Sequence, residues 1–119
     1  MIRTEKEMGI NHYEHMRGGK LSVSAVKFLE AADSYGAGSF FGKAAIPPGG
    51  SIGYHEHKGE FEIYYILEGT AKVNDDGKEA VLHPGDMMQC RDGSSHSIEN
   101  IGDKDLVFLA MVLYNHEGE

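Results

Sequence analysis

Cysteine is almost absent from this sequence, because Cys90 is the single example in 119 residues. One cysteine cannot form an internal disulfide framework, so we expect a reducing compartment and one domain, residues 1–119, that rests on its own core. The first seven residues mix charges and lack the apolar segment of a secretory signal. No apolar run reaches the about 20 residues that span a bilayer. These absences favour a cytoplasmic protein without membrane contact.

Basic residues are also few. The chain has 11 Lys and Arg against 19 Asp and Glu, which gives a formal net charge of −8. Such a chain repels phosphate backbones on average, and no basic cluster offsets the repulsion. We therefore exclude nucleic acid as a partner.

Glycine is abundant, with 16 residues, and it favours tight turns over helices. Turn signals such as Pro47-Pro48-Gly49-Gly50 and Asp75-Asp76-Gly77 separate short apolar or β-branched segments. Many short strands with regular turns indicate an all-β sandwich or barrel. The predicted strands are residues 21–29, 40–46, 51–57, 61–67, 71–74, 78–82, 87–90, 96–100 and 106–114.

A short helix is predicted in the N-terminal extension, residues 1–20. Thr4 and Glu7 have the spacing of a capping box, in which the two side chains bond the first free backbone N–H groups. We expect the helix to continue to about Arg17 and to end at Gly18-Gly19.

Three histidines and one carboxylate have the spacing of a metal site. His55 and His57 lie two residues apart, which places both imidazoles on one face of a strand. A hairpin-like return brings Glu62 beside them, and closure of a barrel brings in His96 from a later strand. This donor set suits a divalent first-row transition metal, with Mn, Fe, Ni or Zn as candidates. Taken alone, the His55–His57 pair is more typical of the solvated face of an edge strand than of a pair of metal ligands.

Two consecutive motifs resemble those of the cupin family. The first reads Gly49-x5-His55-x-His57-x4-Glu62-x6-Gly69 and matches at every fixed position. The second reads Gly85-x5-Arg91-x-Gly93-x2-His96-x3-Asn100 and departs only at Arg91, where the family usually has proline. Together the motifs cover residues 49–100.

The resemblance implies a double-stranded β-helix, or jelly-roll barrel, of six to eight strands with a metal inside one end. It implies His55, His57, Glu62 and His96 as the ligands. Asn100 would bond a loop backbone, and the motif glycines would serve turns.

The side chains near the metal follow from strand parity. Tyr64, Ile66 and Ile98 should face inward and form a mostly apolar wall. Tyr64 is the candidate catalytic residue, as a proton donor, although a core aromatic role fits as well. On these strands no Lys or Arg occupies a position whose side chain faces inward. Arg91 is either an anchor for a carboxylate at the pocket mouth or a solvated loop residue.

Two classes of function fit this sequence. The first is a metal-dependent enzyme that acts on a small polar molecule such as a sugar acid or keto acid, since small cupins resemble isomerases, epimerases, dioxygenases and lyases. The second is a non-catalytic module that binds or senses a small ligand in the same pocket. We also expect a homodimer, because the last strand has an apolar outer face. That face comprises Val107, Leu109, Met111 and Leu113.

Overall fold

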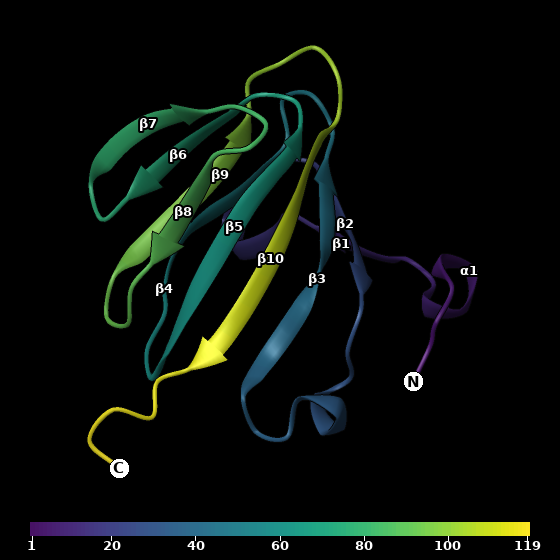
Figure 1. Cartoon of the computed structure of the whole chain (residues 1–119). Coiled ribbons are helices and arrows are strands. Elements are labelled where there is room, and N and C mark those ends of the chain that lie inside the picture. The colour runs from purple at the N-terminus through teal and green to yellow at the C-terminus, as the bar shows by residue number, and fades with distance from the viewer.

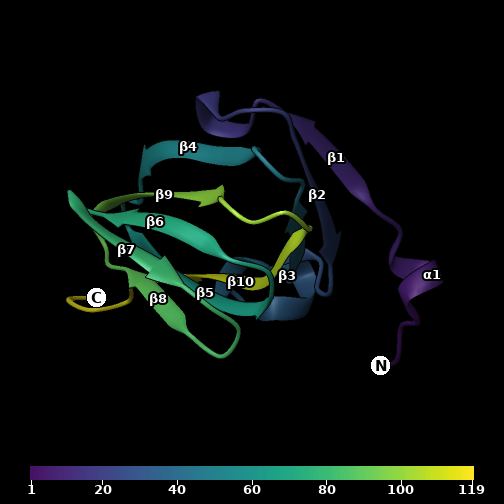
Figure 2. The ribbon, with the colours of Figure 1, turned by 90° about the horizontal axis from the view of Figure 1, so that it is seen from above.

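Two antiparallel sheets face each other in the computed structural model, which describes residues 1–119 (Figures 1 and 2). The six-stranded sheet has the order β1 (Asn11–Glu14), β2 (Ser22–Lys27), β3 (Gly38–Ile46), β10 (Leu106–Tyr114), β5 (Glu60–Glu68) and β8 (Met87–Cys90). The four-stranded sheet has the order β4 (Ser51–Glu56), β9 (Ser95–Asn100), β6 (Ala71–Asp75) and β7 (Lys78–Leu82). The predicted all-β, two-sheet fold is confirmed, and all nine predicted strands are present.

The N-terminal segment differs from the prediction. The helix α1 (Glu5–Met8) has four residues and ends at Gly9, whose φ of 72° is left-handed. The expected continuation to Arg17 is wrong, since the chain forms the extra strand β1 and the 3-10 turn η1 (Met16–Gly18) instead. β1 is an edge strand that pairs with β2 on one side, and this long-range partner outweighs a local helical pattern with few apolar residues. Thr4 makes no side-chain cap bond.

The core lies between the two sheets. Alternate residues of β10 are buried, which is the pattern expected for a strand with one inward face. The structure also contains a second 3-10 turn, η2 (Ala31–Ser34), and none of its helices has the length and apolar character of a bilayer crossing. The fully buried side chains include Ile46, Ile66, Ile98, Leu106 and Phe108.

The loop after β9 is held by Asn100. Its side-chain N–H groups donate to the carbonyl oxygens of Ile46 and Lys104, each at 2.8 Å, and its Oδ1 accepts from the Gly102 N–H at 2.9 Å. The structural role implied for Asn100 is therefore confirmed. Gly69 has a φ of 86°, and a Cβ there would lie 2.8 Å from the Asp105 carbonyl oxygen, so this turn requires glycine.

Candidate metal centre

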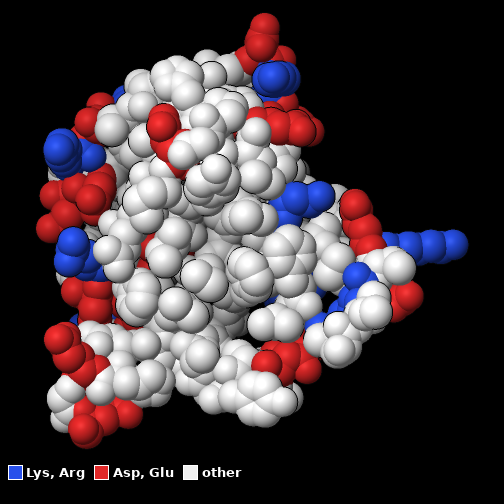
Figure 3. Space-filling model, in the orientation of Figure 1, with Lys and Arg blue, Asp and Glu red and all other residues white.

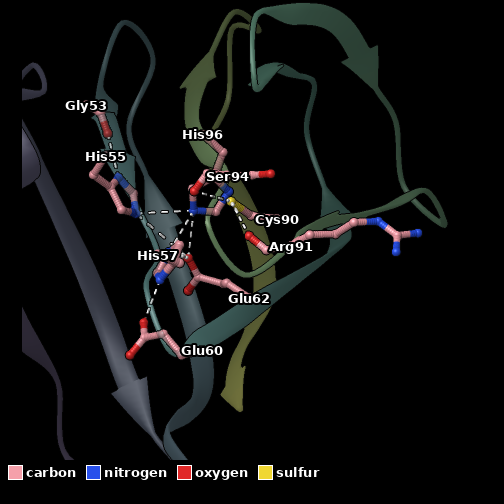
Figure 4. Close-up of polar contacts among 9 residues, drawn as sticks. All are labelled: Gly53, His55, His57, Glu60, Glu62, Cys90, Arg91, Ser94 and His96. Carbon is pink, nitrogen blue, oxygen red and sulfur yellow. Dashed lines mark hydrogen bonds and ion pairs between the residues drawn. The ribbon is translucent and has the colours of Figure 1, made fainter. Parts of the chain in front are cut away.

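Both sheets contribute to one cluster of three histidines and a glutamate (Figure 4). His55 on β4 lies directly opposite His96 on β9 in the four-stranded sheet. His57 follows β4 and remains buried, while Glu62 comes from β5 in the facing sheet. The ligand atoms of the four residues lie within 4.8 Å of one another. The structure therefore brings together all four residues that the motifs identify.

The separations of these atoms fit a first-row metal. His57 Nε2, His96 Nε2 and Glu62 Oε1 lie between 2.9 and 3.1 Å apart. His55 Nε2 lies 3.2 Å from His96 Nε2 but 4.0 Å from Glu62 Oε1. Donor atoms that bind one first-row metal ion at about 2.1 Å lie no more than about 4.2 Å apart. These five separations are all within that limit, so the donors could share one ion.

One hydrogen bond fixes the orientation of each of the His55 and His57 rings. His55 Nδ1 lies 2.7 Å from the Gly53 carbonyl oxygen, and His57 Nδ1 lies 2.5 Å from Glu60 Oε2. Both partners are acceptors, so each Nδ1 carries the proton. In the neutral ring the Nε2 lone pair then points at the cluster. Carboxylate or carbonyl partners of this kind orient metal-bound histidines in proteins.

His96 is the most enclosed member of the cluster, with no exposed side-chain area. Its Nδ1 is buried without a hydrogen-bond partner, whereas its Nε2 faces Glu62 and the other two imidazoles. A buried polar atom without a partner lowers stability. The lone pairs of Glu62 Oε1 and of the histidine Nε2 atoms converge near His96 Nε2. One cation can bind all of these lone pairs, whereas one proton cannot. The donor set therefore fits a metal ion.

Charge within the cluster is uneven. Burial opposes ionisation of Glu62 most strongly, yet hydrogen bonds from His57 and His96 lower its pKa to about 2. The pKa of His57 is raised, first by its hydrogen bond to Glu62 and also by Glu60. Burial lowers the pKa of His55. The carboxylate is thus ionised at neutral pH, and His57 holds a proton more firmly than His55 does before a metal binds.

Tyr64 lies beneath the cluster on β5. Its ring stacks on the His96 ring, with centroids 4.9 Å apart and an angle of 16°, and its edge meets Phe108. Burial, and then the Glu62 carboxylate, raise the pKa of Tyr64 well above its usual value. The hydroxyl is therefore protonated at neutral pH, and it is a weaker acid than an ordinary tyrosine. The predicted inward direction of Tyr64 is confirmed.

A cavity of about 320 Å³ opens onto the cluster. His55, His57, Glu62 and Tyr64 line it, and most of its lining is apolar, as predicted. Ile66 and Ile98 face inward as predicted and are fully buried, but they pack in the core and do not line the cavity. Strand parity predicts that a side chain faces inward, but it does not predict whether that side chain reaches the cavity. Further apolar lining residues include Met16, Val23, Ala25, Phe40 and Ala110.

Three charged residues of the cavity were not predicted. Glu60 has the parity of Glu62, and Lys27 has the parity of Val23 and Ala25, so strand parity could have identified both. Arg17 comes from the η1 turn, and no strand pattern indicates its position. No Lys or Arg has inward parity on β5 or β9, as predicted, but Lys27 on β2 and Arg17 in η1 line the cavity.

Arg91 and Cys90 lie beside the cluster without entering the cavity. Arg91 is exposed and its side chain points away from the histidines, which corresponds to the solvated loop residue (Figure 4). Cys90 is buried, and burial raises the pKa of its thiol to about 12. A thiol with such a pKa is not a reactive nucleophile at neutral pH.

Comparisons with known proteins agree with the geometry. Residues 42–112 match the family described as Cupin domain (Cupin_2). The chain is 40% identical to an oxalate-binding protein of Thermotoga maritima over 113 residues, which cover 95% of this chain and 93% of that protein.

Solved structures are similar as well. A crystal structure of a predicted oxalate decarboxylase from Thermotoga maritima superposes with a TM-score of 0.93 and 39% identity, over 97% of this chain and all of that one. The cupin domain of Schizosaccharomyces pombe Cnp3 has a TM-score of 0.72 at 14% identity, over 88% and 69% of the two chains, a likeness that concerns the fold alone.

Proposed function

The chain belongs to the cupin family, and we propose that it binds a divalent first-row transition metal and, on that metal, a small carboxylic acid. His55, His57, Glu62 and His96 would hold the metal, with Mn, Fe, Ni or Zn as candidates. A bound metal would supply a Lewis acid for a carboxylate oxygen. The proposal rests above all on the convergence of four donor atoms, three of them from buried residues, beside a cavity.

Small carboxylates fit the cavity better than other polar ligands. Its volume of about 320 Å³ lies at the lower end of ligand pockets, and most of its lining is apolar. The relative from Thermotoga maritima is named as an oxalate-binding protein, which makes oxalate the first compound to test. Keto acids and sugar acids share the carboxylate and remain candidates.

Thermal unfolding tests this proposal directly. Metal-loaded protein and protein stripped with a chelator are each heated with oxalate, pyruvate, gluconate or glucose 6-phosphate. We expect the midpoint to rise by at least about 5 °C with a carboxylate in large excess over its Kd, and only in loaded protein. Elemental analysis of the purified protein identifies the metal. Stabilisation by a sugar phosphate that survives chelation would contradict both the site and its ligand class.

Catalysis is the second candidate function, and Tyr64 is the residue that supports it. Loss of a carboxyl group as carbon dioxide leaves a carbon that must receive a proton. Tyr64 lines the cavity and is protonated at neutral pH, and the carbon left by the lost carboxyl group is basic enough to take a proton even from a weakly acidic phenol. Substitution Tyr64→Phe should keep the ring stack and the metal but lower the rate of product formation about 100-fold or more. Binding of oxalate without release of carbon dioxide or formate would leave the non-catalytic module as the function.

A homodimer through the six-stranded sheet is part of the proposal. Met111 pairs with Phe41 on β3 and with Ile63 on β5, so the three side chains share the outer face. Tyr65 and Met87 extend this face and are 43% and 53% exposed. Figure 3 displays the same side of the molecule, where Lys, Arg, Asp and Glu lie mostly at the margins of an uncharged surface. A second copy of the chain would cover it.

A further inference from the structure

Arg17 is a cationic residue at the metal cavity that no strand pattern explains. It belongs to the η1 turn, and its φ of 54° and ψ of 32° are left-handed, as is the backbone of His15. Left-handed backbone is uncommon outside glycine, and it persists where surrounding contacts impose it.

Close backbone contacts hold the turn against β4. A Cβ at Gly53 would lie 2.0 Å from the Arg17 carbonyl oxygen, and a Cβ at Gly19 would lie 2.1 Å from the Ser51 carbonyl oxygen. Lys20 and Ser51 add two hydrogen bonds across the same contact. Because two glycines allow the backbones to meet, the position of Arg17 is fixed by the same strand that bears His55.

The Arg17 side chain has no partner within the chain. Arg3, by contrast, is paired with Asp33 at 2.8 Å and donates to the Phe28 carbonyl oxygen. Arg17 lines the same cavity as His55, Glu62 and Tyr64. Arg17 thus brings an exposed guanidinium without an ion-pair partner to the lining of the cavity that opens onto the metal cluster.

The charges that line the cavity, together with a bound metal, would attract an anion. Arg17 and Lys27 balance the carboxylates of Glu60 and Glu62, so a divalent metal leaves two positive charges in surplus. A dianion neutralises this surplus, whereas a monoanion does not. Arg17 suits the recognition of a carboxylate better than Lys27 does, since its planar fork donates two parallel hydrogen bonds.

We propose that Arg17 binds the second carboxylate of a dicarboxylic acid whose first carboxylate is bound by the metal. This inference rests on the proposed function, and it adds a residue that selects dicarboxylates over monocarboxylates. It also assigns a purpose to the left-handed η1 turn, which holds the guanidinium at the cavity.

Calorimetric titration of metal-loaded protein tests the role of Arg17. Oxalate, malonate, succinate and acetate are titrated into the wild-type protein, Arg17→Gln and the control Arg91→Gln. We expect Arg17→Gln to weaken the tightest dicarboxylate about 10- to 100-fold, as lost charge-assisted hydrogen bonds would, and to change acetate less than about twofold. Arg91→Gln should match the wild type for every ligand. Metal content and thermal midpoint are measured for each variant.

The outcomes separate this inference from the proposed function. Wild-type protein that holds metal but binds no carboxylate overturns both. Dicarboxylate binding that Arg17→Gln leaves unchanged, or that falls in parallel with acetate, overturns the role of Arg17 alone, as does loss of metal from that variant. Should Arg17→Gln fail to fold, Arg17→Lys decides: it keeps the charge without the fork, and we expect a loss of at least about threefold for the dicarboxylate only.

Discussion

His57 Nδ1 lies 2.5 Å from Oε2 of Glu60, and the two residues are separated by only Lys58 and Gly59. The contact fixes the imidazole plane and places the Nδ1 proton away from the metal cluster. Glu60 also lines the cavity, where its side chain is 28% exposed. Glu60 is thus a positioning residue for a metal ligand, and its removal should affect the metal before it affects the fold.

Substitution of Glu60 is expected to weaken metal binding. Glu60→Ala removes the acceptor and should lower metal affinity about 10- to 100-fold, as loss of such partners does in other metal sites. Glu60→Gln keeps an acceptor oxygen and should lose less. Glu56→Ala is the matched control, because Glu56 is exposed on β4 and absent from the cavity lining. Competition with a chromogenic chelator measures the affinities, and equal values for all three variants would refute the role of Glu60.

Substitution of a cluster histidine should abolish metal retention. His57→Ala and His96→Ala each remove one of four donors. We expect less than about a tenth of the wild-type metal after dialysis, with the β-rich circular dichroism spectrum preserved, and a stability loss of about 1–3 kcal/mol for buried His96. His83→Ala serves as the control, since His83 is exposed and remote from the cluster. Full metal content in His57→Ala would show that the ligand set is wrong.

Metal affinity should depend on pH through His57. Its hydrogen bonds to Glu62 and Glu60 raise its pKa above the usual 6.5, so the metal must displace a proton near neutral pH. Apparent affinity should therefore fall, by up to about tenfold per pH unit for one proton, as the pH decreases through the pKa of His57. Glu62, with a pKa of about 2, adds nothing in this range.

Calorimetry in two buffers of different ionisation enthalpy counts the protons released as the metal binds. Glu60→Gln removes one of the causes that raise the pKa of His57. The variant should therefore show its loss of affinity at lower pH than the wild type. An affinity that stays constant between about pH 5.5 and 7.5 would contradict the proton displacement.

The stability of the fold should depend on the amide group of Asn100. Its N–H groups donate to two carbonyl oxygens, so Asn100→Asp replaces a donor with a buried charge facing those oxygens. We expect a loss of about 2–4 kcal/mol in urea unfolding. Asn74→Asp is the matched control, because only the Oδ1 of Asn74 is used, in a bond from the Gly77 N–H. That variant should differ from the wild type by less than about 0.5 kcal/mol, and equal losses would contradict this account.

The strands and the four clustered residues were predictable because each depends on short-range sequence. Alternation and turn residues gave the nine strands, and two motifs gave His55, His57, Glu62 and His96. The family assignment is confirmed. The cytoplasmic location and the single domain over residues 1–119 stay predictions.

The N-terminal segment was not predictable from local pattern. Residues 11–14 are all exposed and have no clear strand alternation, and only pairing with β2 makes them a strand. The position of Arg17 likewise depends on its left-handed backbone, which is uncommon for a residue other than glycine, and on the close approach of that backbone to Gly53. Contacts between segments far apart in the sequence decide both, and a single sequence does not record them.

Association through the outer face of β10 should respond to a single charge. Met111→Glu places a carboxylate between the paired residues Phe41 and Ile63, at the centre of the proposed dimer contact. Burial of an unpaired charge there costs several kcal/mol, so we expect a monomer of 13.1 kDa where the wild type has twice that mass. Val81→Glu on β7 is the control, since Val81 is 50% exposed on the other sheet. Light scattering at about 50 µM, well above the Kd of a stable dimer, measures the mass. A wild-type monomer at that concentration, or a Met111→Glu dimer, would refute this contact.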